Sequence, residues 1–521
     1  MARLAKNNVR EYLVPAPGDG LNVPSPPNMT VAQFNAKRLT AKDNCILLGE
    51  MVFRPEDQAQ FARISGDFNR MHIDAVAARR LITGKAVVHG IHLLLQALEF
   101  AMQHSPFAPK SVACTFNNPV SVGDNAQFIL AKGSESQLKI AVIVNELVCA
   151  TVILDRNDSL PGRQSVPSAL GEDKSAVAVP IDLPPSAHVG RSYRIGLQGR
   201  RGGGAFLSVA QHMSHDYVAS LCALSYFVGM VCPGLHSIFS SLKVWTAGGA
   251  LRDLSFSVLS YDERFQIFNI AVQGALLGEV RAFQRPPPAA QPSMNDVAPF
   301  VGTGEFLATR SVIVGGSRGL GELTAKLLAS GGGDTVITYA HGREDASRVA
   351  AEIRDSGVGS CESVRFDVMD DSIEAIDIDL KSLDMLFYFA TPRIYRKKAR
   401  VFEEALFEEF VSIYVKRFFT LCEYLEANVN RRVAVYFPSS VFVDQRGAGF
   451  AEYGMAKVAA EALIADINRS FKRLTIYVTR LPRLSTDQTS ALFSLEASSN
   501  VDTLLPILRA MHGLVKSGRE H

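Results

Sequence analysis

Apolar and polar positions divide the chain into three patterned segments, and the last of these is the most regular. Within it, helix-like runs alternate with short runs of β-branched residues, which lie at 311–315, 335–339, 363–367, 385–389 and 433–437. Strands that alternate with helices in this way predict a parallel sheet with helices on both faces. We therefore expect an α/β, Rossmann-type doubly wound domain over residues 305–521.

The two earlier segments, 46–156 and 175–285, share a different order of elements. In the first, a helix-like run from His89 to Met102 precedes strand-like runs between 115 and 154. In the second, a helix-like run over 217–242 precedes strand-like runs between 254 and 283. One long helix followed by antiparallel strands, occurring twice, predicts a duplicated α+β unit.

Three further stretches lack such patterning. Residues 1–45 form an irregular N-terminal extension, and residues 157–174 are polar and interrupted by proline and glycine. Residues 286–304 are rich in proline and poor in large apolar side chains, so we expect an extended spacer between the second α+β unit and the Rossmann-type domain.

Composition narrows the function classes. The chain has 521 residues and a formal net charge of +2, which gives no general electrostatic reason to bind nucleic acid or a membrane surface. The 7 cysteines are scattered singly, without C-x-x-C pairs, so we expect reduced thiols and no metal site. No signal peptide and no apolar run of membrane-spanning length are apparent, so we expect a soluble, cytoplasmic protein.

A glycine-rich turn joins the first strand of the last segment to its first helix, in SVIVGGSRGLGELTAKLL. Gly315, Gly319 and Gly321 allow a tight turn and let a pyrophosphate approach the backbone at the helix N-terminus, where free N–H groups face the anion. A glycine motif alone is a weak signal, because glycine-rich turns also occur without a ligand.

A second signal lies at Tyr453 and Lys457, whose spacing places both side chains on one face of a helix. A lysine ammonium close to a phenol stabilises the phenolate, so that the tyrosine can exchange a proton near neutral pH. Ser440, at the end of an apolar strand, can hydrogen-bond a substrate carbonyl.

Together these motifs resemble the short-chain dehydrogenase/reductase family. The resemblance implies that Tyr453 is the general acid, that Lys457 tunes it and holds the ribose, and that Ser440 positions the carbonyl. It also implies a cofactor site made of Gly315, Ser317, Arg318, Gly319, Leu320, Gly321, Asp367, Val368, Ala390, Tyr453 and Lys457. The chain departs from the family where N-N-A-G becomes Tyr388 to Thr391, where an asparagine becomes Tyr414, and where a proline-glycine pair becomes Pro482-Arg483.

Charge at the end of the second strand indicates which cofactor is used. NAD-selective sites usually place an acidic residue there, whereas this strand continues through Tyr339 to Arg343 without an acid before Glu344. Arg318 lies within the glycine turn, where it could face a 2′-phosphate. We therefore expect NADPH rather than NADH.

The first α+β unit carries a different constellation, FARISGDFNRMHIDAVAARRLITGKAVVHG. Asp67 and His72 lie in a polar turn, and Gly90 opens the apolar helix. An acid and an imidazole held together can share one water, one group taking its proton while the other delivers a proton to carbon. The N–H groups at the start of the helix can stabilise an enolate-like thioester oxygen.

This stretch resembles the MaoC-like, (R)-specific enoyl-thioester hydratases, which have a hot-dog fold. Their pattern is met at Ser65, Gly66, Asp67, Asn69, His72, Asp74, His89 and Gly90, with Arg70 in place of the motif's proline. The resemblance implies that Asp67 and His72 are catalytic and that the Gly90 amide forms the oxyanion site. The second unit lacks the motif, so we expect a double hot-dog with one active half, in which Cys232 and His236 are core or wall residues.

The combined chemistries favour a bifunctional enzyme that acts on acyl thioesters. Its two activities would be an NADPH-dependent 3-oxoacyl reductase and an (R)-3-hydroxyacyl dehydratase (enoyl hydratase). Both activities fit fatty-acid or polyketide-type biosynthesis. A degradative hydratase/3-hydroxyacyl dehydrogenase, a hot-dog thioesterase and a non-catalytic acyl-binding scaffold remain alternatives. The acyl group could be carried on an acyl carrier protein or on coenzyme A, and assembly into a homo-oligomer stays open. The basic run 393–400 is either a solvated loop or a docking site for that carrier.

Overall fold

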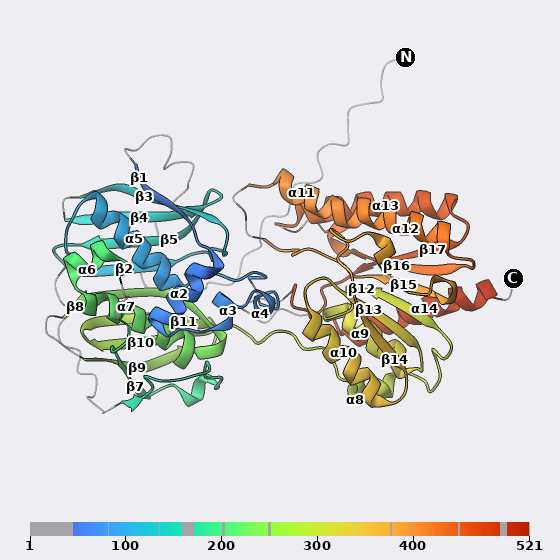
Figure 1. The fold of residues 1–521 in the computed structure, drawn as a ribbon, viewed down its shortest axis with the longest axis horizontal. Helices are drawn as coiled ribbons and strands as arrows, with labels where there is room; N and C mark the ends of the chain where they lie inside the picture. Colours follow the sequence, from blue (N-terminus) through green and yellow to red (C-terminus); the bar gives the residue numbers. More distant parts are fainter. Residues whose placement is uncertain are drawn as a thin grey trace, which may run out of the picture.

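The computed structural model describes residues 45–81, 83–134, 136–158, 171–200, 204–247, 252–375, 378–396, 398, 400–445, 447, 449–489 and 498–519. The expected N-terminal extension lies outside these residues except for Cys45, as does most of the polar stretch 157–174. The described chain forms two bodies, an N-terminal one around an 11-stranded sheet and a C-terminal one around a 6-stranded sheet (Figure 1).

The large sheet is built from two like sets of strands. The first set is β1 (Ile46–Val52), β2 (Ser111–Phe116), β3 (Asn125–Ser134), β4 (Gln137–Val144) and β5 (Leu147–Asp155). The second is β7 (Ser192–Gly196), β8 (Ser237–Thr246), β9 (Asp253–Asp262), β10 (Ile267–Gly274) and β11 (Leu276–Gln284), with the short β6 (Glu172–Asp173) beyond it.

The strand order β1-β3-β4-β5-β2-β8-β11-β10-β9-β7-β6 reads alike outward from its centre, where β2 and β8 pair antiparallel. The predicted duplication of an α+β unit agrees with this order.

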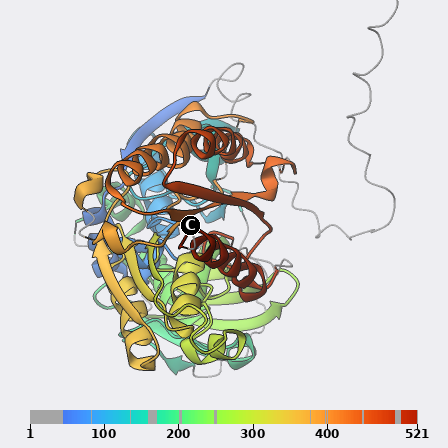
Figure 2. The ribbon, with the colours of Figure 1, turned by 90° about the vertical axis from the view of Figure 1, so that its right-hand side faces the viewer.

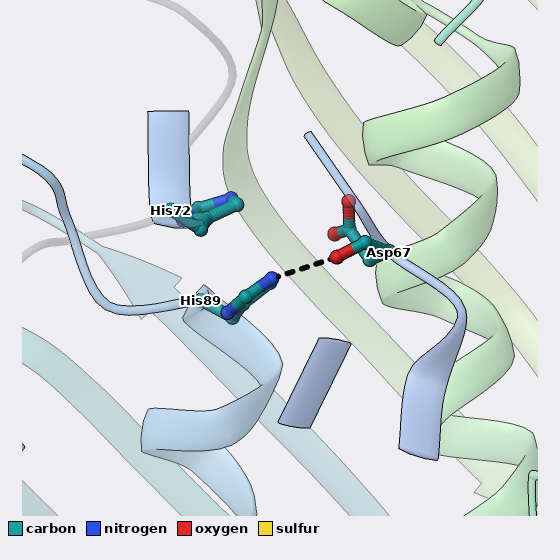
Figure 3. A group of neighbouring side chains, drawn as sticks. All are labelled: Asp67, His72 and His89. Atoms are coloured by element: carbon teal, nitrogen blue, oxygen red, sulfur yellow. Dashed lines mark hydrogen bonds between the residues drawn. The ribbon is translucent and has the colours of Figure 1, made fainter. Parts of the chain in front are cut away.

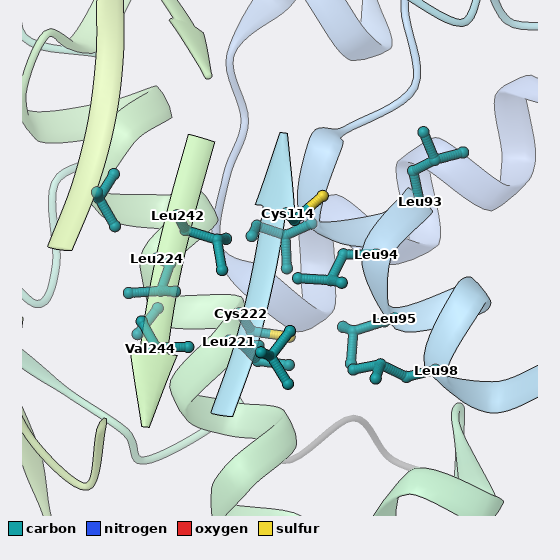
Figure 4. Close-up of a cluster of buried hydrophobic side chains, with 14 of the residues drawn as sticks. Leu93, Leu94, Leu95, Leu98, Cys114, Leu221, Cys222, Leu224, Leu242 and Val244 are labelled. Carbon is teal, nitrogen blue, oxygen red and sulfur yellow. The ribbon is translucent and has the colours of Figure 1, made fainter. Parts of the chain in front are cut away.

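Each unit contributes a long helix to a shared core. The helices of this body are α2 (Pro55–Ser65), α3 (Arg70–Ile73), α4 (Ala75–Ala78), α5 (Gly90–His104), α6 (Leu207–Met213) and α7 (His215–Tyr226). Leucines of α5 and α7 are buried together with apolar residues of β2 and β8 in one cluster (Figure 4). Because both units fill this core, neither buries its apolar face alone.

The predicted helix over 217–242 is wrong in its last part. After α7 the chain makes a π-helical turn at Phe227–Val231 and a short 3-10 turn at Gly234–His236, and β8 begins at Ser237. Pro233 cannot donate the backbone hydrogen bond that would continue a helix. The apolar residues beyond it pair with β2 and β11 in the middle of the sheet, which local sequence does not reveal.

The C-terminal body has the predicted Rossmann-type sheet. Its strands are β12 (Arg310–Val314), β13 (Asp334–Tyr339), β14 (Ser360–Arg365), β15 (Met385–Tyr388), β16 (Val433–Ser440) and β17 (Leu474–Leu481). They are parallel and ordered β14-β13-β12-β15-β16-β17, the order of doubly wound nucleotide-binding folds.

Helices cover both faces of this sheet (Figures 1 and 2). One core contains residues of α9 (Gly319–Ser330), α10 (Arg343–Ser356) and α14 (Asn500–Arg519). The other contains residues of α11 (Glu404–Val411), α12 (Phe418–Asn428) and α13 (Ala451–Ser470). None of the helices in the described ranges has the length and apolar character needed to cross a lipid bilayer.

The proline-rich spacer is shorter than the predicted 286–304. Ser293 caps a short helix, α8 (Met294–Val297), through reciprocal hydrogen bonds with Asp296. Met294, Val297 and Phe306 are buried in the core of the C-terminal body. Residues from about Ser293 onward therefore pack as part of that body, because three well-spaced apolar side chains are enough to anchor them.

The basic run that follows β15 makes ion pairs within the chain. Three of its described side chains pair with carboxylates of the chain: Arg396 with Glu409, Lys398 with Glu452, and Arg400 with Glu146. Three of these charges thus have partners within the chain, and the choice between a solvated loop and a carrier-docking site stays open. Since Glu146 belongs to the turn between β4 and β5, the last of these pairs also joins the two bodies.

Candidate active sites

The first candidate site brings Asp67, His72 and His89 together (Figure 3). Asp67 follows the left-handed Gly66 at the end of α2, His72 lies on α3, and His89 caps the N-terminus of α5. One polar atom of each side chain lies within 4.8 Å of the others, and the two imidazole rings stack with centroids 3.8 Å apart. The predicted pair is therefore adjacent, and His89 joins it as a third polar group.

Hydrogen bonds fix the tautomer of His72. Its Nδ1 lies 2.7 Å from the carbonyl oxygen of Val87, and a carbonyl can only accept, so Nδ1 carries the proton and Nε2 the lone pair. Burial lowers the pKa of His72 to about 4. Near neutral pH this side chain is therefore an uncharged imidazole with a free basic nitrogen.

The pKa of the Asp67 carboxyl shifts in the opposite direction to that of His72. Its burial raises the pKa to about 7, although a hydrogen bond from Ser225 opposes the rise. Between about pH 4 and pH 7 the favoured form of the pair is accordingly a protonated Asp67 beside a neutral His72.

The second α+β unit holds Asp67 in place. Ser225 of α7 donates from Oγ to the carboxylate at 2.8 Å. Gly229, in the π-helical turn, passes so close that a methyl group there would overlap the carboxylate. Asn69 donates to the carbonyl oxygens of Gly229 and Gly234 at 3.0 and 3.1 Å, which ties the catalytic loop to the same turn.

Sequence reasoning missed Ser225 and Gly229, because the second unit has no recognisable motif. The observation that could have pointed to them is the duplication itself. A second unit with its own long helix but without the acid and histidine motif is expected to pack against the first unit.

The remaining motif positions fall into two groups. Gly90 is the first residue of α5, as predicted, with its Cα against the ring of Phe116, and the oxyanion role of its amide stays a prediction. Arg70 is largely exposed and pairs with Asp74 at 2.6 Å, so its charge is held outside the catalytic pair.

The two residues of the second unit that were expected in the core or at a wall, Cys232 and His236, are both buried. Cys232 is buried in the shared core, where burial raises the pKa of its thiol, and His236 lies 3.5 Å from Asp182.

The Asp67, His72 and His89 cluster also has the geometry of a metal site, but its hydrogen bonds oppose that use. Nδ1 of His89 lies 2.9 Å from Oε1 of Gln58, and Nε2 lies 3.1 Å from the carbonyl oxygen of Asp67. Both nitrogens therefore face acceptors, and His89 presents no lone pair to an ion without breaking one of these contacts.

The second candidate site lies at the carboxyl ends of the parallel strands. Gly315 and Gly319 have positive φ angles of 81° and 59°, and a methyl group on Gly321 would overlap the carbonyl oxygen of Gly315. The turn thus needs glycine to bring α9 against β12 with its first N–H groups open to an anion, so it fits the pyrophosphate of a dinucleotide.

Other predicted cofactor residues gather at the same edge of the sheet. Ser317 and Leu320 belong to the glycine turn and the start of α9, Asp367 and Val368 follow β14, and Ala390 follows β15. The backbone nitrogen of Ala390 lies 3.0 Å from the position a Cβ of Gly315 would take, so the strand end and the glycine turn are in contact.

Arg318 does not point freely into this site. Its Nη1 donates to the carbonyl oxygen of Arg79 at 2.9 Å and lies 3.3 Å from Asp487. Arg79 thus reaches Arg318 from the N-terminal body, and the expectation that the Arg318 guanidinium faces a 2′-phosphate stays a prediction.

Ser440, Tyr453 and Lys457 come together as predicted, from the end of β16 and one face of α13. Burial raises the pKa of Tyr453 to about 12, although its hydrogen bond with Ser440 opposes the rise. The expectation that Lys457 brings this pKa towards neutrality is therefore not met, because burial is the largest influence on the phenol. The Lys457 ammonium donates to the carbonyl oxygen of Pro438 at 2.7 Å, and burial holds its pKa well below the usual range.

Two of the three departures from the family pattern, those at Tyr388 to Thr391 and at Tyr414, contact one another. Tyr414 lies on a π-helical turn, and its hydroxyl is 2.5 Å from Oγ1 of Thr391. The hydroxyl of Tyr388 donates to the carbonyl of Ile413 in the same turn at 2.9 Å. The Tyr414 ring covers the Lys457 ammonium, 3.7 Å from its centroid. These substitutions therefore form one packed unit beside the catalytic lysine.

Two family models each match part of the chain. Residues 24–150 match the model of the MaoC like domain, and residues 310–492 match that of the short chain dehydrogenase. No curated protein matches the chain.

Several solved structures are similar to the chain. One is the angucycline C-6 ketoreductase LanV with bound NADP, which is 18% identical to this chain and has a TM-score of 0.36. The match covers 40% of this chain and 91% of that one. A short chain dehydrogenase from Burkholderia cenocepacia J2315 in complex with NADP has 18% identity, coverage of 40% and 91%, and a TM-score of 0.34. A dehydrogenase/reductase from Sinorhizobium meliloti 1021 has 20% identity, coverage of 41% and 90%, and a TM-score of 0.34.

Proposed function

We propose that this chain, which carries a MaoC-like dehydratase domain followed by a short-chain dehydrogenase domain, reduces and then dehydrates acyl thioesters. The reductase would convert a 3-oxoacyl thioester to the (R)-3-hydroxyacyl thioester with NADPH, and the dehydratase would form the trans-2-enoyl product. The observation that carries the proposal is that one chain holds both an adjacent Asp67–His72 pair and an adjacent Ser440, Tyr453 and Lys457 set.

The protonation states of Asp67 and His72 fit the acid and base roles that dehydration needs. Dehydration needs a base for the C2 proton and an acid for the C3 hydroxyl. Nε2 of neutral His72 takes the proton from C2, the released electron pair forms the C2–C3 double bond, and protonated Asp67 gives its proton to the departing hydroxyl, which leaves as water. Transfer of the proton from His72 to Asp67 then restores the pair. The amide of Gly90 stabilises the negative charge that develops on the thioester oxygen.

The reductase residues support a carbonyl reduction. A nicotinamide cofactor bound at the glycine turn would supply hydride. The Tyr453 hydroxyl gives a proton to the carbonyl oxygen, Ser440 orients that oxygen, and Lys457 stabilises the phenolate that remains. Reduction rather than oxidation agrees with a cofactor site that lacks an acid at the end of β13.

The mirrored strand order supports a double hot-dog in which the second unit has no catalytic pair of its own and instead positions Asp67. A chain that performs reduction and dehydration in succession suits fatty-acid or polyketide-type biosynthesis. Joining the two sites in one chain raises the local concentration of the hydroxyacyl intermediate at the second site.

The test is mass spectrometry of the products formed from 3-oxoacyl thioesters and NADPH, with the acyl group on an acyl carrier protein in one arm and on coenzyme A in the other. The wild-type enzyme should form the enoyl product through a hydroxyacyl intermediate. The Asp67→Asn enzyme should stop at the hydroxyacyl product, and chiral chromatography should identify it as the (R) isomer. An (S) product would show that the reductase does not feed the dehydratase, and release of free thiol would indicate a thioesterase instead.

A further inference from the structure

We propose that Arg79 and Arg80, which belong to the MaoC-like domain, complete the binding site for the 2′-phosphate of NADPH in the reductase domain. The inference rests on the proposed function, since it presumes that the reductase binds NADPH. It adds two specificity-determining residues that lie outside the short-chain dehydrogenase domain altogether.

The position of the two arginines is the first reason. They follow α4, which lies between the two bodies (Figure 1). Nη2 of Arg79 is 2.9 Å from the position a Cβ of Gly342 would take, and Nη2 of Arg80 is 2.6 Å from Oδ1 of Asp345. Gly342 ends the connection from β13 to α10, and the second strand of this fold ends where the adenine ribose is bound. The arginines therefore lie beside the ribose position.

Unused hydrogen-bonding capacity is the second reason. Among the described residues, Nε and Nη2 of Arg79 are buried and have no hydrogen-bond partner, although Nη2 lies 3.7 Å from Asp345. Buried guanidinium donors are costly to leave unpaired. A planar guanidinium with two such donors on one edge suits bidentate binding of a phosphate.

The balance of charge is the third reason. Three guanidinium groups, those of Arg79, Arg80 and Arg318, meet at this point with the carboxylates of Asp345 and Asp487. Burial lowers the pKa of Arg79, and repulsion from Arg318 lowers it further. A surplus of one positive charge remains among these five groups, which favours an anion over a neutral ligand.

The geometry also explains why Arg318 alone does not suffice. Its hydrogen bond to the Arg79 carbonyl and its ion pair with Asp487 both engage Nη1, so this nitrogen is already used within the chain. The same bond holds the backbone of Arg79 against the glycine turn. Arg318 is thus a positioning residue for Arg79, and Asp345 positions Arg80.

The experiment measures binding of NADPH and of NADH to the full chain by calorimetry. The variants are Arg79→Gln, Arg80→Gln and the double variant, with Arg63→Gln, an exposed arginine on α2, as a control for the loss of one positive charge. The double variant should bind NADPH at least roughly tenfold more weakly, because charge-assisted hydrogen bonds to the phosphate are lost. NADH binding should be unchanged, since NADH lacks the 2′-phosphate. The control should match the wild type with both cofactors.

Other outcomes separate the proposals. Unchanged NADPH affinity in the double variant would overturn the inference and leave the reductase function standing. Equal weakening of NADPH and NADH would also overturn it, because the arginines would then serve only to hold the two bodies together. A wild-type chain that binds neither cofactor would overturn the proposed reductase itself. Protection of the wild type, but not the double variant, against thermal unfolding by 2′,5′-ADP gives an activity-independent confirmation.

Discussion

Replacing Asp67 by asparagine should abolish dehydration and at the same time stabilise the chain at alkaline pH. In the folded chain, burial raises the pKa of the Asp67 carboxyl from 3.8 to about 7. A raised carboxyl pKa means that folding favours the protonated form. The carboxyl therefore costs no folding free energy well below its unfolded pKa, and the cost grows as pH rises to the folded value.

The magnitude follows from the linkage between pKa and stability. At about pH 8 the buried carboxylate costs roughly 4 kcal/mol, and at about pH 5 it costs less than half of that. Asparagine keeps the shape, carries no charge, and its carbonyl can still accept the hydrogen bond of Ser225. The stability advantage of Asp67→Asn over the wild type should therefore grow by about 2 to 3 kcal/mol between these pH values.

Urea denaturation monitored at both pH values measures this difference. Asp124→Asn serves as a matched control, because that carboxyl lies in a turn outside the catalytic pair and accepts the backbone N–H of Ser121. A stability difference between Asp67→Asn and the wild type that does not change with pH would refute the reasoning. The carboxyl would then be ionised in the folded chain at both pH values, and it could not act as the acid of the dehydration.

Three further predictions concern the neighbours of the catalytic groups. Removing the Ser225 hydrogen bond, which lowers the pKa of Asp67, should move the upper limb of the dehydration pH profile from about 7 to higher pH, whereas Ser220→Ala on the same helix should leave the limb in place. Gly229→Ala should reduce dehydration by roughly 100-fold or more while NADPH-dependent reduction persists, since its methyl group would displace the carboxylate; Gly513→Ala, at a position with open space, is the control. Tyr453→Phe should lower carbonyl reduction by roughly 100-fold or more with NADPH binding intact, and wild-type turnover in that variant would contradict its role as proton donor.

Local signals were enough to predict much of the fold and the core of each site. The five predicted strands of the parallel sheet appear within a few residues of their expected positions, because β-branched runs between helical segments have few other structures open to them. The sixth strand, β17, was not predicted. Asp67, His72, Ser440, Tyr453 and Lys457 were found because each lies in a short motif whose spacing matters to its chemistry. The predicted helix over 217–242 was partly wrong because an apolar run in a central strand has no polar face to distinguish it from a buried helix.

Residues that act across long sequence separations could not be found in this way. Ser225 lies 158 positions from the carboxylate to which it donates, and Arg80 lies 265 positions from Asp345. Neither belongs to a motif, and each is an ordinary residue of a helix or turn when read locally. Their roles depend on which surfaces meet, and these contacts are set by the packing of whole units.

The segment from Asn69 to Arg80 contacts both the second α+β unit and the C-terminal body. His72 lies on α3, and Arg79 and Arg80 follow α4 a few residues later, so the segment that presents the dehydratase base also reaches the reductase's cofactor edge. Its other end is held by the second α+β unit through Asn69. A change in cofactor occupancy that moves Arg79 would act on a segment already fixed at Asn69, and the base between these two points would have to absorb the strain. The chain should therefore keep this segment rigid, because each active site depends on a contact that the other domain or unit supplies.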